Sequence, residues 1–205
     1  MTSKYFFKFS SAMIIAATLL LAACHEAPSK GTNEKVALTP VSMAAIGAEA
    51  KGFEVGSQMS ARTIYVFFDA QCSHCGALWN AAKPLKSQAK FVWIPVGLLN
   101  PSSTAQGATL LAAKDPAATM DEHETSLLAN RGGISAGNEL DAQKALVAKN
   151  TELMNRLGFS SVPSIVGIHA QTGALVTKEG AMSTVALASL LGLQTLAAQP
   201  ALTVN

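Results

Sequence analysis

Two cysteines separated by two residues are the feature of this sequence with the clearest chemistry. They occur as Cys72-Ser73-His74-Cys75, soon after the apolar run 63–68. If a helix begins at this motif, the sulfur atoms lie within disulfide-bonding distance, and the first lies over free backbone N–H groups at the positive end of the helix dipole. Both features favour the thiolate, the nucleophile of disulfide exchange. We therefore expect Cys72 to attack and Cys75, one turn later, to resolve the mixed disulfide.

Two other side chains near the cysteines have a predicted influence on this chemistry. An imidazole at His74 either stabilises the Cys72 thiolate, which makes the disulfide a stronger oxidant, or lies on the surface without a role. Asp69 lies three residues before Cys72. Its carboxylate either accepts the proton of Cys75 during resolution or caps the turn after the strand. The sequence leaves both alternatives open.

A CxxC pair is also half of many zinc sites, which gives a hypothesis of another class. The remaining ligands would have to come from Cys24, His25, His123 or His169, because the sequence has no second CxxC and no HxxxH motif. The alternative function is therefore a metal-binding envelope lipoprotein that uses Cys72, Cys75 and histidines. A structural disulfide and a lipoprotein without thiol chemistry are further interpretations. For the leading interpretation we expect no bound metal and no cofactor beyond the redox-active cysteine pair.

Val162-Pro163 is the second element with predicted chemistry. It precedes a predicted strand and follows a long helical segment. Proline is tolerated at the start of a strand, where its missing N–H costs little. In a disulfide oxidoreductase, a cis proline at this place faces the CxxC motif and leaves the preceding backbone free to pair with an extended substrate. Val162 and Pro163 are therefore candidate substrate-binding residues.

The elements that must position these residues follow from apolar patterns and turn residues. Predicted strands cover 63–68, 91–96, 164–169 and 174–177, and predicted helices cover about 73–88, with a kink at Pro84, and 183–191. A helix near 41–51 and a short strand near 53–55 fit the segment before them. The block 101–157 has no convincing strand, and Asp115-Pro116 is typical of a helix start. A strand–helix–strand unit implies a parallel pair, whereas the last two strands form a hairpin. We predict an α/β domain with a mixed central sheet flanked by helices and a helical insertion at about 101–157.

Composition excludes several function classes. The chain has 205 residues, of which 49% are hydrophobic, and its formal net charge is +2. Such a chain is too apolar for intrinsic disorder, and without a basic run it is not expected to bind nucleic acid. Its three cysteines are too few for a disulfide-stapled miniature fold.

The N-terminal residues are predicted to be a targeting signal. Lys4 and Lys8 precede an uncharged apolar segment, 9–23, that is short for a bilayer span and matches a signal peptide. Cys24 follows Leu21-Ala22-Ala23, which resembles the bacterial lipobox, although an ordinary secretory signal is the alternative. We therefore predict a lipoprotein signal at 1–23, a polar tether at 24–35 and one domain at 36–205. Lipid attachment at Cys24 would place the domain on a membrane facing the periplasm. By resemblance to lipoprotein sorting, His25 favours the outer membrane.

Segments 68–75 and 161–163 resemble the thioredoxin-like family of exported Dsb proteins. Segments 94–103, 112–117 and 150–158 are similar to the DsbG branch of the DsbC/DsbG group, and the resemblance covers about 62–193, the expected catalytic core. It implies a thioredoxin-like fold with a helical insertion. It also implies that Cys72 and Cys75 cycle between dithiol and disulfide, with Pro163 opposite them. The implied partners are extended or unfolded exported proteins and a membrane redox protein of the DsbD or DsbB kind.

The sequence departs from that group at three places. Ser73 replaces a usual proline, and Val162 replaces a usual threonine and matches the DsbA loop instead. The segment 24–61 is too short for the N-terminal dimerisation domain of DsbC and DsbG. We therefore expect a monomeric catalytic domain on a lipid anchor, and the direction of exchange, as oxidase, reductase or isomerase, stays open.

Overall fold

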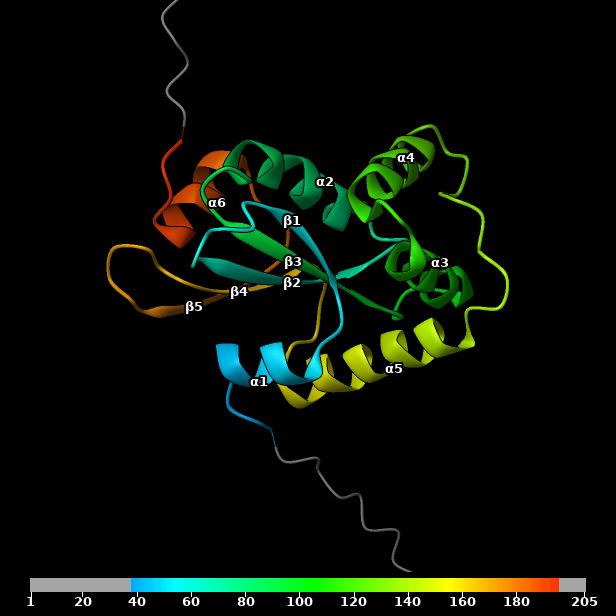
Figure 1. Ribbon diagram of the computed structural model, residues 1–205, viewed down its shortest axis with the longest axis horizontal. Coiled ribbons are helices and arrows are strands. Elements are labelled where there is room, and N and C mark those ends of the chain that lie inside the picture. Colours follow the sequence, from blue (N-terminus) through cyan, green and yellow to red (C-terminus); the bar gives the residue numbers. More distant parts are fainter. Residues whose placement is uncertain (1–37, 196–205) are drawn as a thin grey trace, which may run out of the picture. The chain divides into compact units, whose positions relative to one another are not determined.

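The computed structural model describes residues 38–195, which form a five-stranded mixed sheet with helices on both faces (Figure 1). Its strands lie in the order β1-β3-β2-β4-β5. They are β1 (Phe53–Gly56), β2 (Thr63–Asp69), β3 (Lys90–Val96), β4 (Ser164–Ile168) and β5 (Leu175–Glu179). Only β2 and β3 pair in parallel, and the other neighbouring pairs in this part of the chain are antiparallel. The predicted α/β class and mixed sheet are therefore confirmed.

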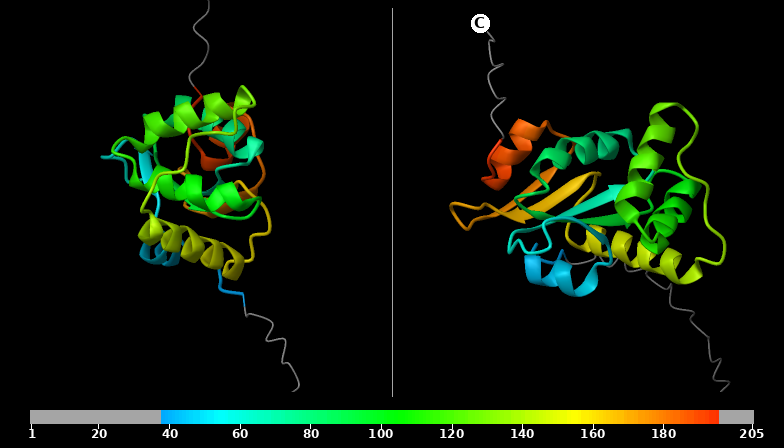
Figure 2. Two further views of the ribbon diagram at one scale, coloured as in Figure 1. Left: turned by 90° about the vertical axis from the view of Figure 1, so that its right-hand side faces the viewer. Right: turned by 45° about the horizontal axis from the view of Figure 1, so that its top comes forward.

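The helices form two layers and an insertion. These elements are α1 (Met43–Glu49), α2 (Ser73–Ala82), the short 3₁₀ turn η1 (Lys83–Leu85), α3 (Pro101–Ala112), α4 (Pro116–Leu128), α5 (Asp141–Arg156) and α6 (Thr184–Leu191). Helices α2 and α6 cover one face of the sheet, and α1 and α5 cover the other (Figure 1). The insertion comprises α3, α4 and α5, which lie one above another in the left view of Figure 2. It follows β3 and lies at the end of the sheet where the CxxC motif begins α2.

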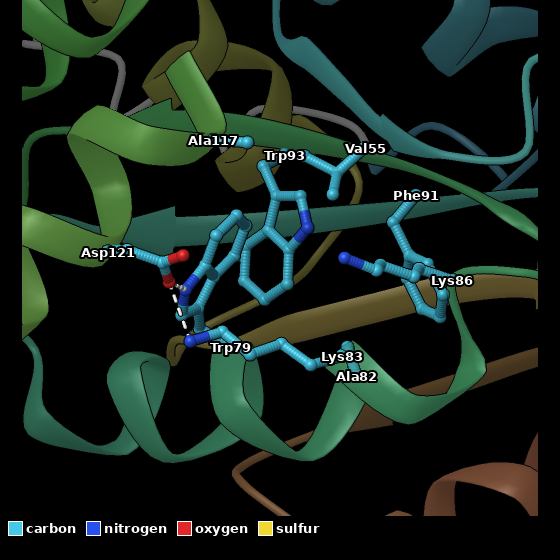
Figure 3. Close-up of a pocket in the computed structure, with 9 residues that line it drawn as sticks. All are labelled: Val55, Trp79, Ala82, Lys83, Lys86, Phe91, Trp93, Ala117 and Asp121. Carbon is cyan, nitrogen blue, oxygen red and sulfur yellow. Dashed lines mark hydrogen bonds and ion pairs between the residues drawn. The ribbon is translucent and has the colours of Figure 1, made fainter. Parts of the chain in front are cut away.

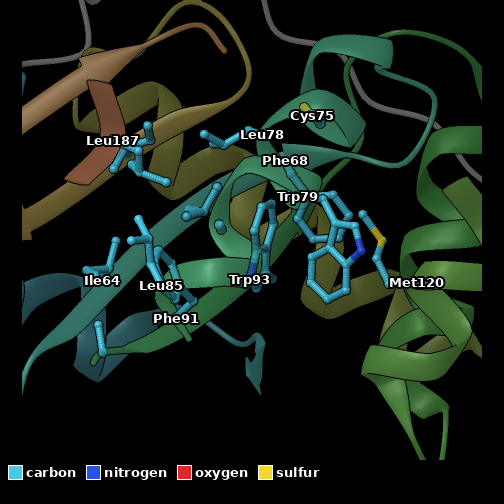
Figure 4. Close-up of a cluster of buried hydrophobic side chains, with 14 of the residues drawn as sticks. Ile64, Phe68, Cys75, Leu78, Trp79, Leu85, Phe91, Trp93, Met120 and Leu187 are labelled. Carbon is cyan, nitrogen blue, oxygen red and sulfur yellow. The ribbon is translucent and has the colours of Figure 1, made fainter. Parts of the chain in front are cut away.

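The two central strands are buried on both faces, as their continuous apolar runs predict. Two hydrophobic clusters result. The cluster under α2 and α6 contains Cys75, Trp79 and Trp93, shown in Figure 4. The cluster under α1 and α5 contains Phe67 and Met154. Because Cys75 belongs to the first cluster, the redox motif is part of the core rather than an addition to the surface.

Boundaries predicted from the sequence differ from the structure at one informative place. The helix expected over 73–88 ends at Ala82 and continues as the 3₁₀ turn Lys83–Leu85. Pro84 has no N–H for an α-helical hydrogen bond, so the α-helical pattern ends before it, although Lys83 keeps helical dihedral angles and donates to the Asn80 carbonyl. The predicted start at Asp115-Pro116 is confirmed, since the Asp115 carboxylate accepts a hydrogen bond from Ala118 N–H at 3.0 Å.

The predicted signal, Cys24 and the tether lie outside the described residues, so these boundaries stay predictions. Between residues 38 and 195, none of the helices combines the length and the apolar composition that crossing a bilayer requires.

Candidate active site

Cys72 is the N-cap residue of α2, and its sulfur faces the first turn of that helix. Its Sγ accepts a hydrogen bond from Cys75 N–H at 3.3 Å, and both cysteines are in the thiol form. A hydrogen bond from the Cys75 side chain lowers the pKa of Cys72 to about 6, against the opposing effect of burial. Backbone N–H groups of Cys75 and His74 lower this pKa further. The arrangement therefore makes Cys72 a thiolate at neutral pH, as its place at a helix start predicts.

Cys75 has the opposite environment. Its side chain is fully buried in the cluster under α2, where Figure 4 places it near Leu78 and Phe68. Burial, together with the hydrogen bond to Cys72 and the charge there, raises the pKa of Cys75 far above its ordinary value. Cys72 is therefore a nucleophile at neutral pH, whereas Cys75 keeps its proton. This asymmetry matches the predicted roles of attacking and resolving cysteine.

His74 is exposed in the first turn of α2. Its charge contributes less to the lowered pKa of Cys72 than the Cys75 hydrogen bonds and the His74 backbone N–H do. The expected influence of the imidazole is therefore present but small. The largest stabilisation of the Cys72 thiolate comes from the Cys75 side chain, and the backbone N–H groups of Cys75 and His74 follow.

The loop before β4 lies against the attacking sulfur. The Val162–Pro163 peptide bond is cis, and the Cys72 thiol donates to the Val162 carbonyl at 3.7 Å. Pro163 is thus placed opposite the motif, as the resemblance implies. A groove of about 480 Å³ runs between the two segments. It is lined by Gln71, Cys72, Ser73, His74, Leu98, Leu99, Ser160, Ser161 and Val162.

Glu179, at the end of β5, holds this loop and was not found from the sequence. Its Oε2 accepts hydrogen bonds from the backbone N–H of Ser160 at 3.1 Å and of Ser161 at 2.7 Å. Both serine hydroxyls also donate to it. The Ser161 hydroxyl is the largest cause of the lowered pKa of Glu179, and the other serine contacts add to it. No local pattern marks Glu179, because its partners lie 18 and 19 residues earlier in the chain.

Asp69 fills the predicted capping role. Its buried carboxylate accepts hydrogen bonds from backbone N–H groups of Gln71 at 2.8 Å, Leu98 at 2.7 Å and Leu99 at 3.0 Å. These contacts join the turn before Cys72 to the loop that follows β3. Proton transfer from Cys75 to Asp69 is not tested by these contacts and stays a prediction.

The helical insertion holds the same turn from the other side. His123 of α4 is fully buried, with Nε2 2.5 Å from the Ala70 carbonyl, while its Nδ1 accepts from Ile134 N–H at 3.1 Å. Burial lowers the pKa of His123, so the ring is neutral. Gln71 donates to Gln106 Oε1 at 2.5 Å and to the Gly132 carbonyl at 3.1 Å. The residues just before Cys72 are therefore fixed by side chains from α3 and α4.

The residues named for the metal hypothesis are not brought together. Both ring nitrogens of His123 are occupied by backbone groups. His169 follows β4 at the end opposite to Pro163, where its Nδ1 accepts from the turn 171–172. Within residues 38–195, no group of three or more His, Cys, Asp and Glu side chains is arranged to hold a metal ion. Cys24 and His25 lie outside the described residues.

A small aromatic pocket beside α2 shows how this helix is joined to the insertion (Figure 3). Asp121 of α4 accepts a hydrogen bond of 2.7 Å from Trp79 Nε1 and pairs with Lys83 Nζ at 2.6 Å. Trp79 also packs edge-on against Trp93, with ring centroids 4.9 Å apart. These contacts fix α4 along α2, so that residues one turn further along α4 lie beside the CxxC motif.

Sequence comparison identifies related proteins over the catalytic part. No family model matches the chain. The thiol:disulfide interchange protein DsbG of Pseudomonas aeruginosa is 33% identical over 133 residues, which cover 64% of this chain and 51% of DsbG. DsbG of Escherichia coli is 34% identical over 104 residues, covering 50% of this chain and 42% of that protein. The aligned part of this chain thus spans about half the length of these relatives, or less.

Comparison with solved structures addresses the fold. A periplasmic thioredoxin-like protein from Salmonella enterica serovar Typhimurium matches with a TM-score of 0.57 and 13% identity, covering 75% of this chain and 97% of that one. The expected thioredoxin-like fold is therefore confirmed. The chain has a thioredoxin-like fold with a helical insertion, and its sequence is similar to that of the DsbG thiol:disulfide interchange proteins.

Proposed function

We propose that this protein is a thiol:disulfide oxidoreductase that exchanges disulfides with extended or unfolded exported proteins. The observation that carries the proposal is the asymmetry of the cysteine pair. Cys72 has a pKa lowered to about 6 at the start of α2, whereas Cys75 is buried behind it with a raised pKa. The similarity to DsbG supports the same chemistry.

The exchange is a two-electron reaction in two steps. The Cys72 thiolate attacks one sulfur of a substrate disulfide, and the other substrate sulfur leaves as a thiolate. Cys75 then loses its proton and attacks Cys72 Sγ, which forms the Cys72–Cys75 disulfide and releases the second substrate thiolate. The substrate is reduced and the protein is oxidised. The same steps in reverse transfer a disulfide to a substrate dithiol.

The groove beside Cys72 supports an extended substrate. Leu98 and Leu99 are 40% and 54% exposed on one side of it, and the Val162 backbone faces the sulfur from the other. An extended segment places alternate side chains against such an apolar edge while its backbone pairs with the loop. A folded substrate would have to release a segment before its cysteine could reach Cys72.

The cellular context belongs to the same proposal. A lipid-anchored protein facing the periplasm, attached through Cys24 and reset by a membrane redox protein of the DsbD or DsbB kind, fits a catalyst of exported disulfides. A monomer fits the expectation drawn from the sequence. No observation favours the metal-binding alternative, which metal analysis of the purified protein tests directly.

The first experiment is a redox titration against glutathione of protein carrying Cys24→Ser, so that only Cys72 and Cys75 can react. We expect one dithiol–disulfide transition. A strongly oxidising potential identifies a donor of disulfides, and a reducing potential identifies a reductase that needs an electron supply. The further change Cys72→Ser should abolish reduction of a model disulfide, whereas Cys24→Ser alone should retain it. Retained exchange without Cys72 would contradict the proposal.

A further inference from the structure

Glu124 of α4 is a buried carboxylate beside the redox motif that the exchange steps above do not use. Its side chain is 5% exposed. Among residues 38–195, its Oε1 is the one buried side-chain oxygen or nitrogen without a hydrogen-bond partner. An unpaired buried carboxylate oxygen is costly, so its presence beside the motif indicates a use.

The Glu124 carboxylate contacts α2 at Gly76, where no side chain is present. A Cβ atom at Gly76 would lie 1.9 Å from Glu124 Oε2, so every residue other than glycine would displace the carboxylate from its present position. Gly76 directly follows Cys75 in α2. Glycine lowers helix stability relative to alanine, and here it allows an acidic group to contact the helix turn that carries both cysteines.

The carboxylate also has a path to water. A cavity of about 320 Å³ opens between α2 and α4, and neither Cys72 nor Val162 of the substrate groove is among the residues that line it. Its lining consists of Gln71, Ser73, Gly76, Ala77, Asn80, Glu124, Leu127 and Leu128. A proton held on Glu124 can therefore be released without crossing the substrate groove.

The charges that face Glu124 come from α2 and from its own helix. Burial, followed by the charge of Cys72, raises the pKa of Glu124 to about 7, while Lys83 lowers it. On α4, Asp121 is paired with Lys83, and His123 is neutral and bound to backbone groups. When Cys72 is in a mixed disulfide its negative charge is gone, so the pKa of Glu124 falls and the carboxylate ionises at that stage. It is then a base at the moment when Cys75 must lose a proton.

Asp69, the other buried carboxylate near the pair, is differently engaged. Its two oxygens accept three backbone hydrogen bonds, which hold the turn before Cys72. Glu124 Oε1 accepts none from the described residues. Asp69 also acts on Cys75 through its backbone carbonyl and its charge. Of the two carboxylates, Glu124 is the one with an oxygen that lacks a hydrogen-bond donor.

We propose that Glu124 takes up the proton of the Cys75 thiol when the mixed disulfide is resolved, an inference that rests on the proposed function. The proton passes from Cys75 Sγ to the Glu124 carboxylate. The Cys75 thiolate attacks Cys72 Sγ, the new disulfide forms, the bond from Cys72 to the substrate sulfur breaks, and the substrate leaves as a thiolate. Glu124 then releases its proton into the cavity. In the reverse direction, protonated Glu124 returns the proton to Cys75 as it leaves.

The test separates the two steps of a single turnover. Full-length protein carrying Cys24→Ser is reduced and mixed with oxidised glutathione, and samples are quenched in acid and measured by intact-protein mass spectrometry. Glu124→Gln keeps the shape of the side chain and removes the base. We expect the glutathione adduct on Cys72 to form and accumulate, with resolution slowed about 100-fold. The matched control Glu122→Gln changes an exposed carboxylate of the same helix and should resolve as the unchanged protein does.

A second variant and a pH profile guard against a merely structural effect. Gly76→Ala displaces the carboxylate while retaining it, so it should also slow resolution, and the double variant should be no slower than Glu124→Gln alone. The mixed disulfide lacks the Cys72 charge, so the resolution rate should show a step below about pH 7, and this step should disappear in Glu124→Gln. Resolution at the ordinary rate and with an unchanged pH profile in Glu124→Gln overturns the inference. Failure of the protein with Glu124 intact to form either the glutathione adduct or the Cys72–Cys75 disulfide overturns the proposed function itself.

Discussion

The backbone N–H of Ser161 donates a 2.7 Å hydrogen bond to Glu179 Oε2, so that β5 determines where the substrate-facing loop lies. The loop carries Val162 to the sulfur of Cys72, while Glu179 itself is not among the residues lining the groove. One carboxylate at the end of β5 thereby fixes the loop that lies against the sulfur of Cys72.

Glu179→Gln should weaken substrate binding more than chemistry. An amide has one acceptor oxygen without charge, and it cannot hold both serine N–H groups and both hydroxyls as the carboxylate does. We expect KM for a peptide disulfide to rise about tenfold through loss of roughly 1.4 kcal/mol of binding, with the pKa of Cys72 unchanged. Steady-state kinetics with thiol titration measures both quantities. Glu152→Gln is a suitable control, and a fall in kcat at constant KM would argue against this role.

Reduced protein should owe part of its stability to the Cys72 thiolate. The pKa of Cys72 is about 6 in the fold against 9.0 ordinarily. A group with a lowered folded pKa stabilises the fold fully above its unfolded pKa, and this stability is lost as pH falls through the folded value. The difference corresponds to about 4 kcal/mol. The advantage of the reduced protein over reduced Cys72→Ser should therefore shrink between about pH 9 and pH 6, measured by urea unfolding. A pH-independent difference would contradict it.

Asp69→Ala should destabilise the protein because it leaves three backbone N–H groups without their acceptor. We expect the free energy of unfolding to fall by about 3 kcal/mol. Asp69→Asn, which keeps one acceptor oxygen, should lose less. Denaturant unfolding of the disulfide form measures this directly. If instead both variants keep their stability and slow only the resolution step, Asp69 is the proton acceptor and the capping interpretation is wrong.

His123 should contribute a pH-dependent part of the stability. Burial lowers the pKa of His123, and the neutral ring bridges Ala70 and Ile134. Its contribution is complete above the ordinary pKa of 6.5 and is lost as pH falls toward the folded value. The stability difference between the unchanged protein and His123→Gln, both as disulfides, should therefore decrease below about pH 6.5. Other titrating groups are shared by the two proteins and cancel in this comparison.

Local patterns in the sequence were sufficient for the elements and the redox motif. The apolar runs of β2 and β3 predicted central strands, and the CxxC spacing after β2 predicted a helix start with two unequal thiols. Val162-Pro163 was predicted opposite Cys72 from its position after the helical block and from the resemblance, and the cis bond is present. Each of these signals is carried by neighbouring residues.

The supporting side chains could not be predicted in the same way. Glu179, Gln106 and Glu124 act on partners between 18 and about 50 residues away, so their roles depend on how α4 and β5 pack. Gly76 carried the nearest available signal, because a glycine inside a helix often marks a close approach. The two alternatives for His74 could not be separated from the sequence either, because the residue letters do not display the backbone donors that lower the pKa of Cys72 more than the His74 charge does.

The turn 69–71 is held at three consecutive residues by separate parts of the protein: Asp69 by the loop at 98–99, Ala70 by His123, and Gln71 by Gln106. The sulfur of Cys72, which directly follows this turn, has little freedom to move toward a substrate. Under the proposed function, adaptation during binding therefore falls to the substrate chain, which loses conformational entropy when it binds in an extended form beside Cys72. For an unfolded chain this entropy is the main cost of binding, whereas a folded chain must also lose native packing contacts. The rigid turn thus favours unfolded substrates over folded ones, whatever their sequence.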